Sequence, residues 1–234
     1  MTTLQVYSMK SKPPYKLIII SDTHLTNRFH APKYEFLKNL VASTEEVILN
    51  GDFWDSYFTS FQDFIQSDWK KLFPLLKQKN ALYLYGNHDR EIDSDSRASL
   101  FSTRQTHTHT MRVGPHVFAI EHGNRFQRAL SEKMPALRNA VPILRQIVRV
   151  ENSIEWALMN VFGWHHYTKM ANTRIKRLYK AGRKNNEVLV IGHTHCPEFD
   201  LEFGFLNSGK MSSGHATYLT IDWNDDIKLH YARY

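Results

Sequence analysis

The sequence predicts an α/β fold with parallel strands. Three short apolar runs rich in β-branched residues each lead into a polar loop, and segments with helical spacing of apolar residues separate them. Such an alternation of strand and helix is typical of a sheet with parallel pairings. The chain has 234 residues, 42% hydrophobic and 23% charged, which is ordinary for a globular protein and excludes a disordered or collagen-like chain.

The first half of the chain supplies the alternating elements. The run Lys16-Leu-Ile-Ile-Ile-Ser21 is typical of a fully buried strand, and similar runs occupy residues 46–50 and 81–85. Helices are expected at 33–41 and at 61–78, where apolar residues recur at intervals of three and four. The order strand, helix, strand, helix, strand follows.

The second half begins with a hairpin and ends with further strands. Residues 108–113 and 116–121 flank the turn dipeptide Gly114-Pro115, and strands are expected again at 187–191, 203–206, 215–222 and 227–231. Between them, residues 125–184 have a helical pattern, with Pro142 suited to a first helical turn and a last helix from about Thr168 to a cap at Gly182. We therefore expect a single domain over residues 1–234 with a helical insert at 125–184.

Composition excludes several classes of protein. No run approaches the roughly 18 apolar residues of a membrane span, and residues 1–16 lack the apolar core of a secretory signal. The single cysteine, Cys196, excludes a disulfide framework and fits a reducing compartment. A cytoplasmic protein is expected, and its net charge of +7 favours anionic partners.

Clusters of carboxylate, amide and imidazole groups follow five of the expected strands. They are Asp22-x-His24, Gly51-Asp52-x-x-Asp55, Gly86-Asn87-His88-Asp89, Glu121-His122-Gly123 and Gly192-His193-Thr194-His195. In α/β sheets, ligands bind beyond the carboxyl ends of the strands, so these clusters can meet in one crevice. Oxygen and imidazole donors without a thiolate cluster indicate a metal site other than structural zinc. An odd number of ligands with one shared carboxylate would hold two ions about 3.5–4 Å apart, as two-metal hydrolases require.

These motifs, in this order, resemble the calcineurin-like metallophosphoesterase superfamily over about residues 17–222, with the helical segment as its least typical part. The resemblance implies an αββα sandwich of two mixed sheets flanked by helices, with a helical insertion before the last metal-binding motif. It also implies two divalent metal ions, with Mn²⁺, Fe or Zn²⁺ left open. The implied ligands are Asp22, His24 and His195 for one ion, Asn87, His122 and His193 for the other, and Asp52 as the bridge.

Two further residues are expected to act on the substrate. His88 is placed to stabilise phosphoryl oxygens or to protonate the leaving group, and Asp89 is expected to orient its imidazole. Asp55, which has no ligand position left to fill, is expected to support the site through a hydrogen bond.

Three sequence motifs, together with the insert, resemble those of the UDP-2,3-diacylglucosamine hydrolase branch. The motifs are Ser-Asp-Thr-His-Leu, Gly-Asp-Phe-Trp-Asp and Gly-His-Thr-His-Cys-Pro. Enzymes of that branch cleave a pyrophosphate of a nucleotide-linked lipid, and their insert covers the acyl chains. This chain departs from the branch at His88, where Arg is typical, and at Asn124, where Asp is typical.

The positive charge is concentrated in the insert. Residues 125–184 contain thirteen Lys or Arg against three Glu, a net +10, so the rest of the chain, with seventeen against twenty, carries −3. Basic helices with an apolar face can lie on anionic membranes, can follow a nucleic-acid backbone, or can be a solvated face without a partner. The oligomeric state is left open.

Several functions therefore compete. The leading hypothesis is a hydrolase of a phosphodiester or pyrophosphate, with an anionic phosphate-containing substrate. The alternatives are a phosphodiesterase or nuclease acting on nucleic acid, a protein phosphatase, and a scaffold that keeps the fold without the metals.

Some residues near the motifs receive a structural interpretation. Cys196 is expected to be a small neighbour of His195, and Asn207 with Ser208 are expected to form a turn. Trp54 and Tyr57 are either packing residues or a stacking wall for a base.

Overall fold

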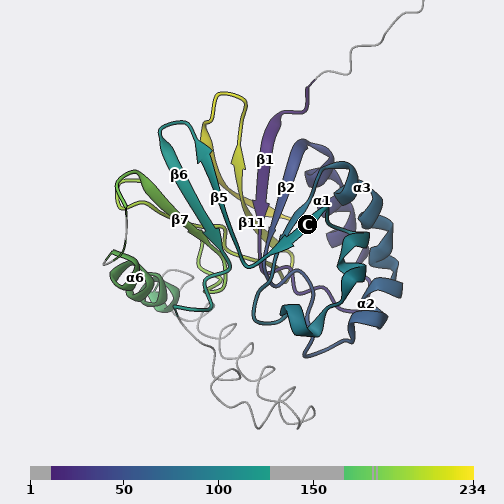
Figure 1. The fold of residues 1–234 in the computed structure, drawn as a ribbon. Helices are drawn as coiled ribbons and strands as arrows, with labels where there is room; N and C mark the ends of the chain where they lie inside the picture. The colour runs from purple at the N-terminus through teal and green to yellow at the C-terminus, as the bar shows by residue number, and fades with distance from the viewer. Residues whose placement is uncertain (1–11, 127–165, 181, 183) are drawn as a thin grey trace, which may run out of the picture.

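Two β-sheets lie face to face, and helices cover the outer face of each (Figure 1). The computed structural model describes residues 12–126, 166–180, 182 and 184–234. The part of the predicted insert that contains Pro142 lies outside these residues. The expected αββα sandwich of two mixed sheets is confirmed.

The larger sheet has seven strands and carries the first three motifs. Its order is β10-β11-β1-β2-β3-β4, and β12 pairs with β11. β1, β2, β3 and β4 are parallel to one another, whereas β11 is antiparallel to β1, β10 and β12. The strands are β1 (Tyr15–Ile20), β2 (Thr44–Asn50), β3 (Leu82–Leu84), β4 (Arg104–Thr106), β10 (Met211–Ser212), β11 (His215–Ile221) and β12 (Ile227–Arg233).

The smaller sheet has five strands in the order β5-β6-β7-β9-β8. β6, β7 and β9 are parallel, while the β5–β6 hairpin and the β8–β9 pair are antiparallel. The strands are β5 (Thr108–Val113), β6 (His116–Glu121), β7 (Glu187–Ile191), β8 (Glu198–Asp200) and β9 (Phe205–Asn207).

Three hydrophobic clusters hold the layers together. The inner cluster joins Leu17, Ile19 and Ile48 of the larger sheet to Phe118 and Val190 of the smaller one. A second cluster lies between the larger sheet and the helices α1 (Ala31–Ala42), α2 (Phe61–Gln66) and α3 (Phe73–Gln78). The third lies between the smaller sheet and α6 (His166–Lys180). Alternate residues of β1 therefore face different layers, as a strand buried on both faces requires.

The single helix predicted for residues 61–78 is wrong. The segment contains α2, a 3₁₀ turn at Asp68–Leu72 and α3. Ser67 ends α2 in an extended conformation, with φ −65° and ψ 171°, and its side chain accepts a hydrogen bond from Trp69 N. Pro74 then stands in the first turn of α3, where its missing N–H costs nothing. The apolar residues keep a helical spacing along the whole segment because α2, the 3₁₀ turn and α3 all bury the same side of the segment.

The other predicted elements differ from the structure mainly at their ends. The hairpin β5–β6 and strand β7 have the predicted bounds, and α6 begins two residues earlier than expected. Three strands were not predicted, β4, β8 and β10, each with three residues or fewer. Such short strands leave too few positions for a period of two to be recognised. Asn207 ends β9, so the turn predicted at this residue is wrong.

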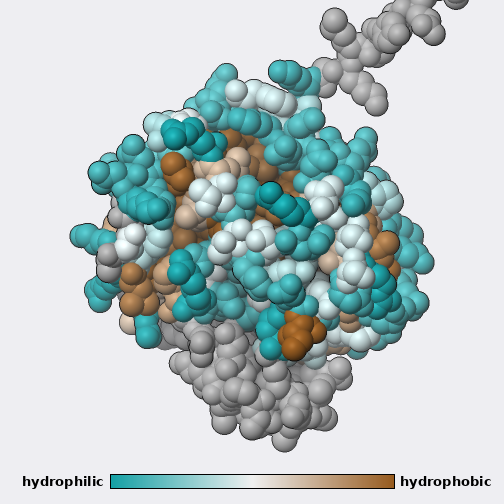
Figure 2. Space-filling view, in the orientation of Figure 1, coloured by the Kyte–Doolittle hydropathy of each residue, from teal (hydrophilic) through white to brown (hydrophobic). Residues whose placement is uncertain are grey.

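The face of the molecule in Figure 2 is mostly hydrophilic, with smaller hydrophobic areas. Among the described residues, no helix is long and apolar enough to cross a membrane.

Candidate metal centre

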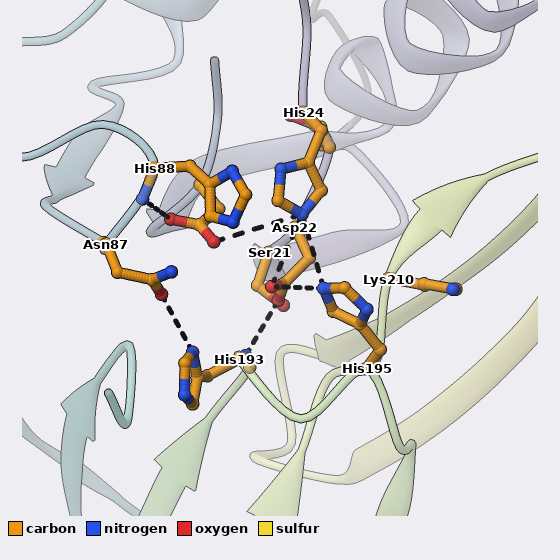
Figure 3. Close-up of polar contacts among 12 residues, drawn as sticks. Ser21, Asp22, His24, Asn87, His88, His193, His195 and Lys210 are labelled. Carbon is orange, nitrogen blue, oxygen red and sulfur yellow. Dashed lines mark hydrogen bonds and ion pairs between the residues drawn. The ribbon is translucent and has the colours of Figure 1, made fainter. Parts of the chain in front are cut away.

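The predicted metal ligands lie directly beyond strand ends at one edge of the sandwich. Asp22 follows β1, Asp52 follows β2 and Asn87 follows β3, while His122 follows β6 and His193 follows β7. Because β1, β2 and β3 are parallel, and so are β6 and β7, their carboxyl ends meet at this edge. Figure 3 shows Asp22 among side chains that arrive from both sheets.

Five of the seven predicted ligands have a left-handed backbone. The φ angles are 51° at Asp22, 44° at His24, 52° at Asp52, 60° at His193 and 58° at His195. Residues with a Cβ rarely adopt this conformation, and it persists only where surrounding contacts impose it. Backbone strain is therefore concentrated at the residues that the sequence predicts to be metal ligands.

Backbone hydrogen bonds between two loops impose this conformation on the first motif. Asp22 N donates to Gly51 O at 3.1 Å, and His24 N donates to Asp52 O at 2.9 Å. The loops after β1 and β2 therefore run side by side, and each fixes the other.

The two buried aspartates, Asp22 and Asp52, have the same arrangement. Asp22 Oδ2 accepts the backbone N–H of His193 at 3.0 Å, and Asp52 Oδ1 accepts the backbone N–H of His88 at 2.8 Å. The second oxygen of each carboxylate faces imidazole nitrogens: Asp22 Oδ1 lies 3.3 Å from His195 Nε2, and Asp52 Oδ2 lies 3.2 Å from His122 Nε2. One oxygen is thus held by a backbone amide, while the other is directed into the site.

Three residues of the first predicted set gather around one point. His24 Nε2 lies 3.3 Å from His195 Nε2 and 3.9 Å from Asp22 Oδ1. One donor atom from each of these residues lies within 4.8 Å of the other two, which is close enough for a single ion. The structure brings Asp22, His24 and His195 together as expected.

The three residues of the second predicted set also lie close together. Asn87 Oδ1 lies 3.1 Å from His122 Nε2 and 2.9 Å from His193 Nδ1. His122 Nδ1 lies 3.0 Å from Asn50 O, so a proton on Nδ1 leaves the Nε2 lone pair facing the site. The donor atoms of Asp22, Asp52 and His122 also form a group within 4.8 Å.

This donor set fits divalent cations. Asp22 Oδ1 is buried and makes no hydrogen bond to the described residues, and buried carboxylate oxygens are normally paired. Imidazole nitrogens and carboxylate oxygens are ligands that first-row divalent metals accept. The three groups of donors overlap, because Asp22, His24 and Asp52 each belong to two of them. The assignment of each residue to an ion stays a prediction.

His88 lies at the rim of this cluster. Its side chain is 15% exposed and approaches His24 with a ring-centroid distance of 4.5 Å. His88 also forms a donor group with His24 and Asp52, which was not expected from the sequence.

The expectation that Asp89 orients His88 is wrong. Asp89 is fully buried, and its carboxylate accepts backbone N–H groups of Asp52 at 2.9 Å, Phe53 at 2.6 Å and Gly86 at 2.7 Å. It therefore ties the loops after β2 and β3 together. The carboxylate that reaches His88 belongs to Asp55, whose Oδ1 lies 3.2 Å from His88 Nδ1.

The buried carboxylates control protonation of the histidines. Burial disfavours the imidazolium of His122, but the charges of Asp52 and Asp22 outweigh it and raise the pKa of His122 to about 10. His88 behaves in the same way: burial lowers its pKa, but the charges of Asp55 and Asp52 outweigh this effect and raise the pKa to about 9. For His24, burial and the neighbouring His88 lower the pKa.

Two glycines of the motifs are required by close contact. A Cβ on Gly86 would lie 2.6 Å from Asp52 N, and a Cβ on Gly192 would lie 2.5 Å from Ser21 Cβ. Neither glycine has a positive φ, so it is the close contact, and not the backbone conformation, that excludes a side chain at these two positions. The absence of a side chain lets the loops approach one another.

Sequence reasoning missed the polar residues that hold the last motif. Asn207 is fully buried, and its Nδ2 donates to Gly192 O at 3.1 Å and Thr194 Oγ1 at 2.8 Å. Ser208 Oγ donates to Ile191 O at 3.2 Å and lies 2.7 Å from Ser21 Oγ. The polar pair Asn207-Ser208 directly after the apolar pair Phe205-Leu206 is the sequence signal that could have indicated this role.

The remaining predictions near the site concern packing. Trp54 is 1% exposed and stacks on Phe64, so it belongs to the core. Tyr57 is also buried, and its ring meets the edge of His88 at 4.5 Å between centroids. Cys196 is buried next to His195 and forms no disulfide.

A family profile matches this sequence over residues 15–226, and its description is Calcineurin-like phosphoesterase superfamily domain. The chain belongs to the calcineurin-like phosphoesterase superfamily. The match covers every strand of the two sheets except β12, and all the motifs that form the site. The resemblance stated from the sequence is therefore confirmed at the level of the superfamily.

Several solved structures are similar to this chain at low identity. The phosphoesterase YfcE from E. coli is 18% identical, with 88% of each chain covered and a TM-score of 0.46. Vps29 from Entamoeba histolytica, solved with Zn²⁺, is 14% identical, with 93% of this chain and 98% of that chain covered and a TM-score of 0.45. A predicted phosphoesterase from Streptococcus pneumoniae TIGR4 is 15% identical, with 94% and 89% covered and a TM-score of 0.43. No curated protein sequence matches the chain.

Proposed function

We propose that this calcineurin-like phosphoesterase hydrolyses a phosphodiester or pyrophosphate bond with the aid of two divalent metal ions. The observation that carries the proposal is the common arrangement of Asp22 and Asp52. Each has one carboxylate oxygen held by a backbone amide and the other directed at imidazole nitrogens from a different motif.

The proposed ligands are those that the structure brings together. Asp22, His24 and His195 would hold one ion, Asn87, His122 and His193 the other, and Asp52 would be shared. When bound, a pair of divalent ions lowers the pKa of a water molecule and neutralises charge on phosphoryl oxygens. Oxygen and imidazole donors suit Mn²⁺, which we propose as the native metal, with Fe and Zn²⁺ as alternatives.

His88 is the chain's own proton donor in this proposal. In the protein without bound metal, Asp55 and Asp52 raise the pKa of His88 to about 9 against the effect of burial, and these two carboxylates favour the protonated imidazole. A positioned imidazolium can donate a hydrogen bond to a phosphoryl oxygen or a proton to the leaving oxygen. Because Asp55 holds the Nδ1 side, Nε2 is the nitrogen available for the substrate.

A nucleotide-linked lipid is the proposed substrate class. The motif tokens around Asp22, Asp52 and His195 and the basic insert support it, since a nucleotide diphosphate is anionic and a basic amphipathic helix can lie at an anionic membrane surface. We accordingly propose a cytoplasmic protein at the periphery of a membrane. The basic face of α6, with exposed Lys169, Arg174, Arg177 and Lys180, also favours nucleic acid as a second candidate.

A substrate panel with Mn²⁺ tests the activity. We expect turnover of a nucleotide-diphospho-lipid and of a bis-aryl phosphodiester. Turnover of single-stranded DNA, a cyclic nucleotide or a phosphopeptide would move the assignment to those classes. For the nucleic-acid candidate, affinity must also fall linearly with salt on a log–log plot.

Asp52→Ala tests the role of the metals. We expect loss of bound metal and of activity together, because the shared carboxylate is removed. Asp68→Ala is the matched control, since Asp68 is exposed and forms a surface ion pair with Lys71. Full turnover by Asp52→Ala would contradict the two-metal proposal, and a wild-type protein that binds no metal and is inert with Mn²⁺ would favour a scaffold.

A further inference from the structure

Helix α6 contributes one fully buried amide to the turn that carries His193 and His195. Asn172 is 0% exposed and lies on the inner side of the helix. Its Oδ1 accepts hydrogen bonds from Thr194 Oγ1 at 2.7 Å and from Asn207 Nδ2 at 3.2 Å. Its Nδ2 donates to Cys196 O at 3.0 Å and to Glu198 Oε2 at 2.8 Å. Both the oxygen and the nitrogen of the amide are thus hydrogen-bonded. Three of the four bonds join Asn172 to the segment from Thr194 to Glu198 that follows β7.

The turn that Asn172 contacts is strained. His193 and His195 both have a left-handed backbone, and Thr194 stands between them. Conformations of this kind are sparsely populated and persist when surrounding structure imposes them. Thr194 Oγ1 meets Asn172 on one side and Asn207 Nδ2 at 2.8 Å on the other, so its hydroxyl is held from two elements distant in sequence.

The helix itself is anchored by other contacts. Ile175 and Tyr179 pack with Leu189, Ile191 and Phe205 of the smaller sheet. Lys176 Nζ forms ion pairs with Glu198 and with Asp200, the latter at 2.6 Å. The position of α6 therefore depends on these residues, and Asn172 is available to transmit that position to the turn.

We propose that Asn172 is a positioning residue that fixes the turn Gly192 to His195, and through it the two imidazoles that face the proposed metal site. The expected effect of Asn172 on metal binding rests on the proposed function. The effect on the turn stands on the hydrogen bonds alone. Partners behind metal ligands are typically worth 10–100-fold in metal affinity.

Two variants test the contact from its two sides. Asn172→Ala removes the amide, and Thr194→Val removes the hydroxyl at nearly constant volume while leaving Asn172 and the packing of α6 in place. We expect each to weaken Mn²⁺ binding about tenfold, measured from the signal of free Mn²⁺ in electron paramagnetic resonance. The loss of affinity in the double variant should be smaller than the two single losses combined, because both changes break the contact between Asn172 Oδ1 and Thr194 Oγ1.

Lys176→Met is the matched control on the same helix. It removes the ion pairs with Glu198 and Asp200 and leaves the contact with Thr194 intact. We expect its Mn²⁺ affinity to stay within about twofold of the wild type. An equal loss in Lys176→Met would show that docking of the helix as a whole, rather than Asn172, determines the turn, and would overturn the proposal.

Hydrogen–deuterium exchange tests the role of Asn172 independently of metal binding. Amide exchange of residues 192–196 should be faster in Asn172→Ala and in Thr194→Val than in the wild type and Lys176→Met, with or without metal. Exchange rates that are unchanged in both variants would overturn the proposal. If the wild type binds Mn²⁺, an affinity equal to the wild type's in both variants would overturn it as well. If Asn172→Ala does not fold, Thr194→Val decides alone. If the wild type binds no Mn²⁺, the metal proposal fails and the exchange rates alone decide the role of Asn172.

Discussion

Asp55 Oδ1 lies 3.2 Å from Nδ1 of His88, a residue thirty-three positions later in the chain. The other oxygen of the same carboxylate lies 3.5 Å from His24 Nδ1. One buried side chain thus stands behind both a predicted metal ligand and the proposed proton donor. A carboxylate behind an imidazole fixes the ring orientation and raises the basicity of the nitrogen that faces the site.

Asp55→Asn should alter the pH dependence of turnover. The Asp55 carboxylate raises the pKa of His88. A donor imidazolium is active below its pKa, and activity is lost as the pH rises through it. We expect the alkaline limb of kcat to move to lower pH and kcat to fall about tenfold. Asp95→Asn, at an exposed site, is the control, and an alkaline limb that stays in place would contradict the role given to Asp55.

Metal affinity should rise with pH. The pKa of His122 is raised to about 10, because the charges of Asp52 and Asp22 outweigh burial, so the metal-free protein carries a proton there at neutral pH. A metal ion must displace that proton, and affinity should increase by up to about tenfold per pH unit for each proton released. Calorimetry at pH 6, 7 and 8 in buffers of different ionisation enthalpy measures both the affinity and the protons. An affinity that is constant over this range would refute the expectation.

Gly86→Ala should damage the site through a steric effect. The added Cβ would lie 2.6 Å from Asp52 N and close to its carboxylate, so the loops after β2 and β3 must separate. Overpacking of this kind costs about 1–3 kcal/mol, and here it also displaces the shared carboxylate. We expect lower thermal stability and loss of metal binding. Gly182→Ala is the control, because no atom of the part of the chain that the structure describes lies within 4 Å of its added Cβ.

Lys33→Met should change how stability depends on pH. Lys33 is buried, and its Nζ donates to Thr23 O and to Met211 O, the latter at 2.7 Å. Burial lowers the pKa of Lys33 to about 7. Between this value and the ordinary lysine pKa the unfolded chain binds more protons, so Lys33 makes the free energy of unfolding rise with pH in that window.

The measurement is urea unfolding at pH 6.5, 7.5 and 8.5. The free energy of unfolding of the wild type minus that of Lys33→Met should increase by up to ~1.4 kcal/mol per pH unit above pH 7. Lys38→Met, on the exposed side of the same helix, should give a difference that is nearly constant. A constant difference for Lys33→Met as well would show that its charge is not suppressed by burial.

Elements with a strong period were predictable and weak ones were not. β1, β5, β6 and β7 follow from runs of apolar or alternating residues, because burial on a sheet selects such runs locally. The break at Ser67 was missed because all three helical pieces bury the same stripe, so the spacing continues across it. Strands of two or three residues, such as β10, exist only through pairing with β11, which no local pattern records.

The candidate site divides in the same way. Its donors were predictable because metal-binding chemistry requires particular residue types, and because parallel strands end at one edge. The roles of Asp55 and Asp89 were not, since neighbours in sequence are not neighbours at the site. Asp89 stands next to His88 in the chain, yet its carboxylate binds the amides of Asp52, Phe53 and Gly86.

By itself, the sequence determined the α/β class, the superfamily and the residues that converge at the strand ends, because these depend on local periodicity and on side-chain chemistry. Only the tertiary structure decided which carboxylate supports His88, why Gly86 and Gly192 carry no side chain, and that Asn172 on α6 reaches Thr194. Those relationships are distances between segments remote in the chain. They arise when the two sheets and the helix pack together, and no period in the sequence encodes them.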